Sequence, residues 1–172
     1  MTALLQESGF AFLAMENKLC YAQSIPISEA NTMNRYIRKV QYHETDKMGI
    51  THHSNYIKWM EEARIFYLDS IGCSYAKMEA DGVSSPVTGV TCSYKTPTTF
   101  GDEVCVEVRV LEYTGVRLAI GYDMRNTATG QTVAECRSEH CFTNAEGRPI
   151  PLKRKYPVYD SLFHRLLAEA EA

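Results

Sequence analysis

Residues 42–64 read YHETDKMGITHHSNYIKWMEEAR, and this stretch contains the strongest secondary-structure signal in the chain. From position 55 onward its apolar side chains recur every three or four residues, which is the spacing of one face of an α-helix. The sequence therefore predicts a helix over Asn55–Ile71, about five turns long. Ser54 or Asn55 is the expected N-cap, and Gly72 follows the last periodic residue.

The second half of the chain alternates apolar and polar residues with the period of two that is typical of β-strands. Short turns separate these segments, so neighbouring strands are expected to be antiparallel. The predicted strands are Tyr36–Tyr42, Val87–Tyr94, Val104–Val110, Leu118–Met124 and Gln131–Phe142, and a short helix over Val158–Ala170 closes the chain. One long helix with a broad apolar face must lie across this sheet. We therefore predict an α+β protein with the hot-dog fold, a curved antiparallel sheet wrapped around one central helix.

The composition of the chain indicates a single globular domain. Its 172 residues are close to the usual size of one domain. The hydrophobic fraction of 45% and the charged fraction of 23% are ordinary for such a protein. A net charge of −3 argues against a dedicated nucleic-acid-binding protein, whose binding surface is strongly basic. We expect one domain over residues 33–172, with an N-terminal extension, residues 1–32, packed on it.

The sequence contains no signal for a membrane, an export pathway or a metal. The longest apolar run, Gly9–Met15, is shorter than the roughly 20 residues that span a bilayer, and no basic segment precedes it. We expect a cytoplasmic protein without membrane insertion. The six cysteines include no C-x-x-C pair, so reduced thiols are expected rather than disulfides. The histidines do not have the spacing of zinc ligands, and no metal is expected.

Asp46 is the first candidate for chemistry. It lies in a glycine-containing loop just before the start of the predicted helix. The free N–H groups of a helix N-terminus stabilise developing negative charge. A carboxylate that faces those donors across a carbonyl is sufficient for acyl transfer, as base or nucleophile beside an oxyanion hole. From the residues alone, a purely structural role for Asp46 in capping a turn stays open.

The same stretch, written Y-x-E-T-D-x-x-G-I-x-x-H-x-N-Y-x-x-W-x-E-x-A-R, resembles the 4-hydroxybenzoyl-CoA thioesterase-like family of hot-dog acyl-CoA thioesterases. The matching positions are Thr45, Asp46, Gly49, Ile50, His53, Asn55, Tyr56, Trp59, Glu61, Ala63 and Arg64. The resemblance continues more weakly through Tyr94, Pro97, Phe100 and Asp102, and it covers roughly residues 36–152. Residues 1–32 and the terminal helix lie outside it.

The resemblance implies roles for individual residues. Asp46 matches the catalytic carboxylate, and His53 matches the position whose backbone N–H binds the thioester carbonyl. In one branch of the family this position is a catalytic histidine, so the His53 imidazole is a second candidate. The implied substrate-binding residues are Gly49, Ile50, Asn55, Tyr56 and Trp59, although Asn55 and Tyr56 also suit helix capping and Trp59 suits the core.

Three other charged residues lie in the same stretch, Glu44, Glu61 and Arg64. Glu44 is a second carboxylate, and it would share a strand face with Asp46 if one strand ran through both. We prefer Asp46, because it matches the motif and is nearer to the helix. Glu61 and Arg64 are expected to form a structural ion pair one turn apart.

The predicted reaction is hydrolysis of an acyl-CoA thioester to a free acid and coenzyme A, with no cofactor beyond the substrate's own coenzyme A. Arg148 and Lys153, in a basic cluster with Arg154 and Lys155, are candidates for binding its phosphates, unless they form a solvated surface loop; Lys95 is another candidate. Relatives pair protomers through exposed sheet edges, so a homodimer or homotetramer is expected. Alternatives are an acyl-carrier-protein thioesterase and a non-catalytic acyl-CoA-binding module.

Overall fold

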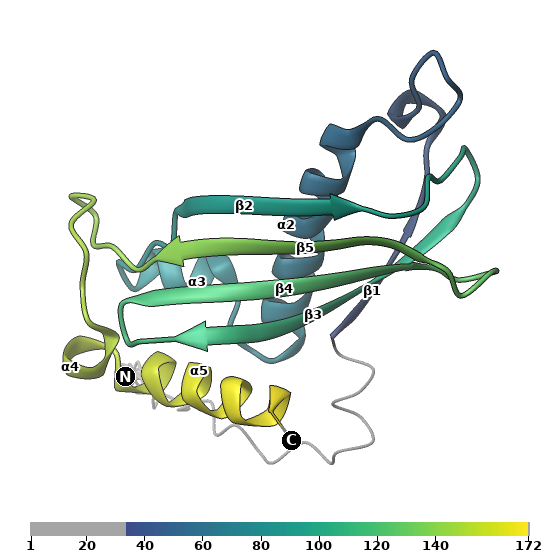
Figure 1. Cartoon of the computed structure of the whole chain (residues 1–172). Helices are drawn as coiled ribbons and strands as arrows, with labels where there is room; N and C mark the ends of the chain where they lie inside the picture. The colour runs from purple at the N-terminus through teal and green to yellow at the C-terminus, as the bar shows by residue number, and fades with distance from the viewer. Residues whose placement is uncertain (1–33, 172) are drawn as a thin grey trace, which may run out of the picture.

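The computed structural model describes residues 34–171 (Figure 1). The extension predicted over residues 1–32 lies outside the described residues, so its packing stays a prediction. Five strands form one antiparallel sheet in the order β1-β3-β4-β5-β2. They are β1 (Arg35–Lys39), β2 (Val87–Tyr94), β3 (Glu103–Tyr113), β4 (Arg117–Asn126) and β5 (Thr132–Cys141). All five strands predicted from the alternating pattern are present.

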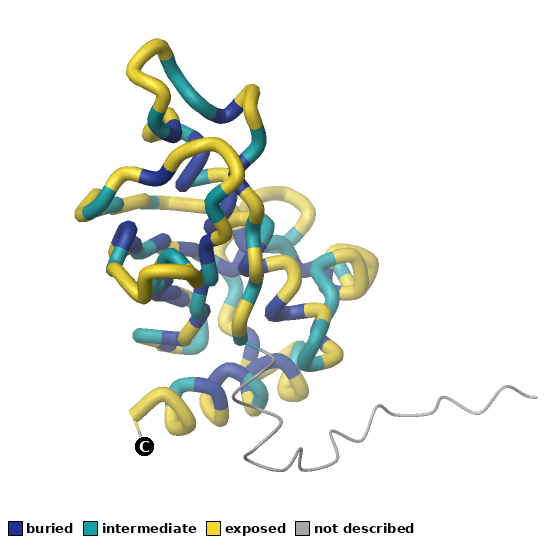
Figure 2. Tube along the Cα trace, turned by 90° about the vertical axis from the view of Figure 1, so that its right-hand side faces the viewer, coloured by how far each residue is buried: buried dark blue, intermediate teal, exposed yellow. Residues whose placement is uncertain are grey.

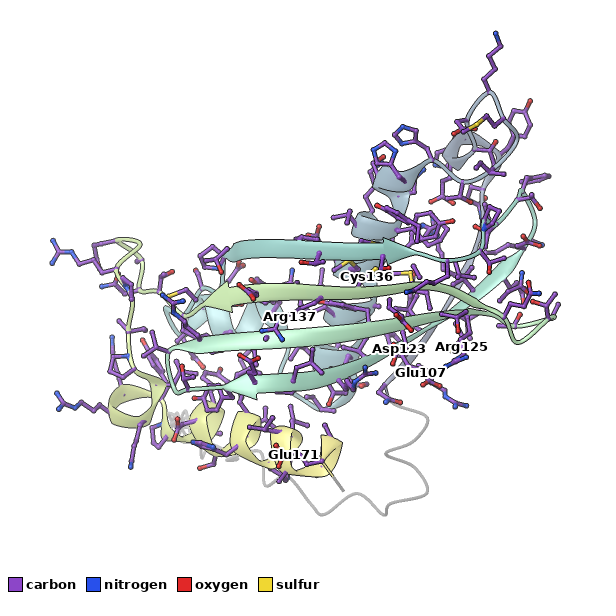
Figure 3. All side chains as sticks on the ribbon, in the orientation of Figure 1. Glu107, Asp123, Arg125, Cys136, Arg137 and Glu171 are labelled. Atoms are coloured by element: carbon purple, nitrogen blue, oxygen red, sulfur yellow. The ribbon has the colours of Figure 1, made fainter. Side chains whose placement is uncertain are left out.

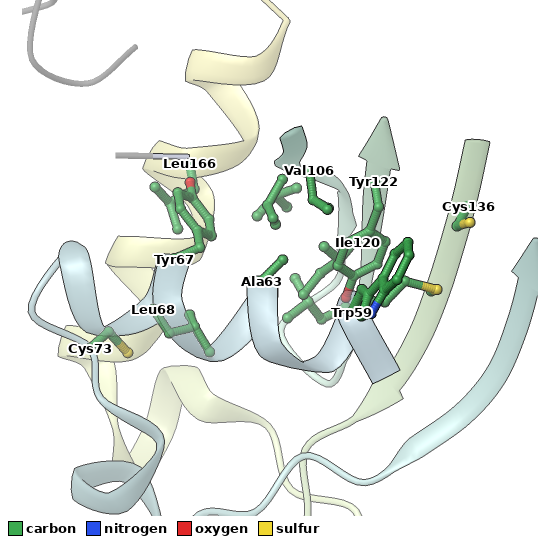
Figure 4. Packing of buried hydrophobic residues seen from close by; sticks show 14 of the residues in the cluster. Trp59, Ala63, Tyr67, Leu68, Cys73, Val106, Ile120, Tyr122, Cys136 and Leu166 are labelled. Atoms are coloured by element: carbon green, nitrogen blue, oxygen red, sulfur yellow. The ribbon is translucent and has the colours of Figure 1, made fainter. Parts of the chain in front are cut away.

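The long helix α2 (His53–Ser70) crosses one face of this sheet (Figure 1). Trp59 and Ala63 on α2 are fully buried, and they face Ile120 and Tyr122 of β4 in the core (Figure 4). Burial of these apolar side chains stabilises the packing of α2 on the sheet, since each large one that is fully buried contributes about 1.5–3 kcal/mol. The predicted hot-dog fold is confirmed: one antiparallel sheet packs around one central helix.

Strand β3 buries one face, as its period of two requires. On β3 the four valines at alternate positions, Val104, Val106, Val108 and Val110, are at most 2% exposed. The residues between them point to the opposite face, where Arg109 forms an ion pair with Asp123 of β4. The core therefore lies between the valine face of the sheet and α2.

Three further helices complete the chain. The C-terminal helix α5 (Pro157–Ala170) contacts β3, and Figure 2 shows it alternating between buried and exposed residues. It corresponds to the short helix predicted from sequence. The short helices α3 (Tyr75–Ala80) and α4 (Leu152–Lys155) were not predicted, because segments of six and four residues are too short to show a helical period.

Two predicted boundaries were wrong. Helix α2 begins at His53, and its N-cap is His52 rather than Ser54 or Asn55; the His52 imidazole accepts a hydrogen bond from the Ser54 N–H. Histidine does not belong to the usual N-cap residues, so the sequence did not reveal this role. The first strand ends at Lys39 rather than Tyr42, and a 3-10 turn, η1 (Tyr42–Glu44), follows it.

Candidate active site

An open cavity of about 320 Å³ lies where the loop after η1 meets the start of α2 and the end of β2. Its lining combines one carboxylate, a helix N-terminus, hydroxyl groups and one lysine. The lining residues are Asp46, Met48, Ile50, Thr51, His53, Tyr56, Tyr94, Lys95, Thr96 and Pro97. The cavity therefore brings together two segments that are far apart in the sequence, residues 46–56 and 94–97.

Asp46 is held in a tight turn at one wall of this cavity. Its Oδ1 accepts the N–H of Met48 at 2.8 Å, and its backbone N–H donates to the carbonyl of Ile50 at 2.9 Å. Gly49, with φ of +76°, closes the turn by donating to the Asp46 carbonyl. A positive φ of this size favours glycine. The turn leaves Oδ2 of Asp46 without a donor from residues 34–171, so this oxygen is available to the cavity.

Glu44, the competing carboxylate, is instead built into the framework. It is 3% exposed. Its Oε1 accepts hydrogen bonds from Arg38 at 2.7 Å and from the Trp59 indole at 2.9 Å, and its Oε2 accepts the Gln41 N–H at 2.7 Å. Burial alone would raise the pKa of Glu44, but these three donors together hold it below its usual value. Glu44 is the last residue of η1 and does not line the cavity, so no single strand runs through both Glu44 and Asp46.

The backbone of Glu44 also anchors the start of α2. Its carbonyl accepts the His52 N–H and the Asn55 side-chain amide, each at 2.8 Å. Asn55 is buried in this role and does not line the cavity. These two hydrogen bonds therefore tie the start of the loop that carries Asp46 to the start of the helix.

His53 is the first residue of α2 and lines the cavity. Across the described residues, 34–171, its backbone N–H donates to no protein acceptor, as expected for the first turn of a helix. Its carbonyl accepts the Tyr94 hydroxyl at 3.1 Å. The imidazole is exposed and stacks on that of His52, with ring centroids 4.1 Å apart. A free N–H at the positive end of an 18-residue helix can donate a hydrogen bond to an anionic oxygen.

A buried chain of three hydroxyls lies behind the cavity wall. Thr98 shares hydrogen bonds with Thr51 at 2.8 Å and with Tyr56 at 3.1 Å. Three hydroxyls carry three protons, and the two bonds use only two of them. Because buried Thr98 must donate to one neighbour to satisfy its own proton, the accepting neighbour keeps its proton. Thr51 and Tyr56 both line the cavity, so the chain can present an O–H donor there.

Tyr94, at the end of β2, closes the cavity from the sheet side. Its ring packs edge-on against that of Tyr56, with centroids 5.3 Å apart. Burial, followed by the nearby Cys92 thiol, raises the pKa of Tyr94 to about 12. The phenol therefore stays protonated near neutral pH and can donate continuously to the His53 carbonyl. Tyr94 belonged only to the weaker part of the family resemblance, which was the one sequence signal for it.

The structure brings together some of the predicted residues and separates others. Ile50 and Tyr56 share the cavity with Asp46 and His53. Gly49 shapes the turn, and Trp59 lies in the core with its indole on Glu44. Thr51 and Thr98 were missed, because neither position belongs to a short sequence motif.

The basic residues are divided between two ends of the molecule. Lys95 lines the cavity, although it is also within 3.1 Å of Glu135. Arg148 is exposed in the loop after β5 and Lys153 is exposed on α4. In Figure 1 this loop and α4 lie at the end of the sheet opposite to η1 and the start of α2. Within one chain, Arg148 and Lys153 therefore do not share the cavity with Asp46.

The predicted ion pair between Glu61 and Arg64 was wrong. Glu61 is exposed, whereas Arg64 is buried and contacts Nδ1 of His140 at 3.1 Å. Burial, together with the Arg64 cation, lowers the pKa of His140 to about 4, so its imidazole is neutral near pH 7. These residues form a polar group inside the core and do not belong to the cavity lining.

The described residues contain neither a cluster of metal ligands nor a membrane-spanning helix. Between residues 34 and 171, no three His, Cys, Asp or Glu side chains are close enough to bind a metal ion. In the same part of the chain, no helix is both long and apolar enough to cross a membrane.

Comparisons with known proteins agree on one family. Residues 40–166 match the profile of the thioesterase-like superfamily. A Bacillus subtilis (strain 168) protein named "Putative acyl-CoA thioesterase YneP" is 32% identical over 74% of this chain and 92% of its own length. The structure of a DHNA-CoA thioesterase from Staphylococcus aureus superposes with a TM-score of 0.75 and 31% identity, covering 80% of this chain and 93% of that one. The BH1999 gentisyl-coenzyme A thioesterase, at 23% identity, TM-score 0.64 and coverage of 72% of this chain and 98% of that one, shares the fold.

Proposed function

The chain belongs to the thioesterase-like superfamily of hot-dog thioester hydrolases, and from this we propose that it hydrolyses acyl-CoA thioesters to a free carboxylic acid and coenzyme A. The observation that carries the proposal is the cavity in which the Asp46 carboxylate and the N-terminus of α2 meet. Two relatives at 32% and 31% identity are named for acyl-CoA and DHNA-CoA thioesters. Coenzyme A is then the leaving group, and no bound cofactor is required.

Asp46 is the proposed catalytic carboxylate. Its free Oδ2 either removes a proton from water or attacks the thioester carbonyl directly. The second route forms a mixed anhydride, which water then hydrolyses to the acid. Both routes need the carboxylate ionised and held still, and the hydrogen bond from Met48 to Oδ1 supports that arrangement.

The N–H of His53 is the proposed oxyanion-hole donor. Attack on the thioester places negative charge on the carbonyl oxygen, and a fixed N–H at a helix N-terminus stabilises that charge. The exposed imidazole of the same residue is the proposed general acid that protonates the departing thiolate. His53 would thus contribute its backbone to the first step and its side chain to the departure of coenzyme A.

Substrate contacts follow from the lining of the cavity. Ile50 and Tyr56 provide apolar surface for the acyl group, and Gly49 keeps the turn narrow beside it. Lys95 is the cation in the same cavity for a coenzyme A phosphate. A phosphate-binding role for Arg148 or Lys153 requires a second copy of the chain, because both lie at the far end of the first.

We propose a homodimer as the minimal assembly. Strand β2 is an edge of the sheet, and it presents exposed Val87, Val90 and Tyr94. Unpaired backbone groups on an edge strand favour pairing with another strand. A homotetramer would be formed by two such dimers.

The proposal is tested by a steady-state screen of short, medium, long-chain and aromatic acyl-CoA thioesters. Wild-type protein should release coenzyme A from at least one of them. Asp46→Asn is nearly isosteric and should lower kcat by about 10²–10⁴-fold, the usual contribution of a general base. Asp69→Asn, on the exposed side of α2, is the matched control and should behave as wild type.

Three outcomes would contradict the proposal. Turnover of acyl-carrier-protein thioesters alone would make the chain a carrier-protein thioesterase. Thermal stabilisation by acyl-CoA without release of coenzyme A would indicate a binding module. Full activity of Asp46→Asn would show that Asp46 is neither the base nor the nucleophile.

A further inference from the structure

Two cysteines on neighbouring strands lie directly opposite each other. Cys92 on the edge strand β2 is the register partner of Cys136 on β5, and Figure 3 shows Cys136 one strand in from that edge. Their Sγ atoms are 2.6 Å apart, and both residues are free thiols. Directly opposed residues of an antiparallel pair have Cα atoms about 4.5–5.5 Å apart, which lies within the range of about 4.4–6.8 Å that a disulfide spans.

The two thiols have different surroundings. Cys92 is half-buried on the exposed edge strand, whereas Cys136 is buried beneath the sheet. A hydrogen bond from the Cys136 thiol lowers the pKa of Cys92 against the opposing effect of burial. The same hydrogen bond, together with burial, raises the pKa of Cys136. Cys92 is therefore the more acidic and more accessible thiol, and the thiolate is the reactive form of cysteine.

We propose that Cys92 and Cys136 form a reversible redox site, in which a hydroperoxide converts the two thiols into an intramolecular disulfide between β2 and β5. The proposal rests on the register, the contact between the two sulfur atoms and the unequal exposure of the two residues. A half-buried attacking thiol beside a buried second thiol is the arrangement expected of a redox-sensitive pair.

The chemistry proceeds in two steps. The Cys92 thiolate attacks one oxygen of the hydroperoxide; an S–O bond forms, the O–O bond breaks, and the second oxygen leaves as water or an alcohol after taking a proton. Cys136 then attacks the sulfur of the resulting sulfenic acid. An S–S bond forms, the S–O bond breaks, and the oxygen leaves as water with the thiol proton. The two sulfurs together lose two electrons, and the hydroperoxide gains them.

The disulfide would join the edge strand β2, whose end forms part of the cavity wall, to its neighbour β5. Tyr94 and Lys95 follow Cys92 at the end of β2, and both line the cavity. A covalent link at position 92 therefore fixes the edge strand two residues before Tyr94. A dithiol reductant reverses the link by thiol–disulfide exchange.

The test measures sulfur chemistry and is independent of whether the chain hydrolyses acyl-CoA. The full-length protein is reduced, treated with hydrogen peroxide, alkylated and digested, and its peptides are identified by mass spectrometry. We expect a linked Cys92–Cys136 peptide pair that lacks two hydrogen atoms, that accumulates before oxidation of the other cysteines, and that disappears with dithiothreitol. Cys92→Ser and Cys136→Ser should abolish the linked pair.

Cys105→Ser is the matched control, because Cys105 is half-buried on β3 and its register partner on β4 is Arg125. This variant should still form the Cys92–Cys136 link. Links between two Cys92 residues of different chains, links from Cys92 to another cysteine, or faster oxidation of Cys105 would each overturn the proposal. The wild-type peptide map decides the question even if a serine variant does not fold.

Discussion

Glu44 and Asp46 are two carboxylates, two residues apart, that the fold places in different environments. Glu44 is buried and accepts hydrogen bonds from Arg38, Gln41 and Trp59. Asp46 lies at the cavity with one oxygen on Met48 and the other free within the described chain. The donors around each carboxylate, rather than its position in the motif, therefore separate a structural acid from a candidate catalytic one.

We predict that Glu44→Gln destabilises the fold by about 2 kcal/mol at pH 7, because it weakens charge-assisted hydrogen bonds. The folded protein holds the pKa of Glu44 below its usual 4.5. Its stabilising contribution is therefore complete above that value and is lost as the pH falls through the lower, folded-state pKa. Urea unfolding from pH 7 down to pH 3 should show the gap between wild type and variant narrowing below about pH 4.5. If the difference in unfolding free energy between wild type and variant did not change with pH, Glu44 would not be stabilised as an ionised, hydrogen-bonded carboxylate.

A second residue-scale prediction separates the backbone of His53 from its side chain. Proline suits the first position of a helix, where the N–H has no helical partner, and His52 has the extended backbone that precedes proline (φ −65°, ψ 134°). His53→Pro should therefore fold while it loses the N–H, and kcat should fall by about 10²–10³-fold.

The matched control is His53→Ala, which keeps the N–H and removes only the imidazole. It should lose much less activity than His53→Pro in the same acyl-CoA assay, and both variants should give wild-type circular dichroism spectra. Equal losses in the two variants would assign the chemistry to the imidazole instead of the N–H.

At the scale of elements, the site depends on the close approach of α2 to the sheet. Ala63 is fully buried at this contact, and Trp59 is fully buried one turn earlier on the same helix. The small side chain of Ala63 lets the helix lie close to the strands. Because protein interiors are close-packed, no room is expected there for a larger side chain.

We predict that Ala63→Leu destabilises the protein by about 1–3 kcal/mol, because added methylene groups overpack a filled core. The free energy of unfolding from urea titration measures the effect. Ala76→Leu on the exposed surface of α3 is the control and should change it by less than about 0.5 kcal/mol. An unchanged stability in Ala63→Leu would show unfilled space between α2 and the sheet.

At the scale of the whole molecule, β2 is one of the two edge strands that the sheet of the described chain leaves with an unpaired side. Its register partners Ser138 and Cys136 are buried, yet Val90 and Tyr94 on the same face are 44% and 48% exposed. Proteins usually cover or pair an edge strand that exposes apolar residues. The β2 strand of a second copy of the chain could pair with this edge and extend the sheet.

We predict that Val90→Lys converts a dimer into a monomer, because a lysine on an edge strand opposes strand pairing. Size-exclusion chromatography with light scattering measures the mass. Val158→Lys, which changes another exposed valine on α5, should leave the dimer intact. A monomeric wild-type protein, or a dimeric Val90→Lys variant, would contradict pairing through β2.

Much of the architecture was determined by the sequence itself. The three-and-four spacing over residues 55–71 and the alternation in the strands predicted one helix and five antiparallel strands, because burial of one face imposes a period on each element. The motif around Asp46 and His53 likewise predicted the loop and the helix start that now face one cavity. These signals are local, so they can be read without knowing the fold.

The tertiary structure alone decided which side chains meet. Thr98 reaches Thr51 and Tyr56 from more than 40 positions away, and Cys92 meets Cys136 only through the register of β2 on β5. Glu44 is buried while Asp46 lines the cavity, because a 3-10 turn stands where the sequence predicted the end of the first strand. Such contacts depend on strand register and on the packing of α2, which are set by the whole core and leave no periodic pattern near the residues themselves.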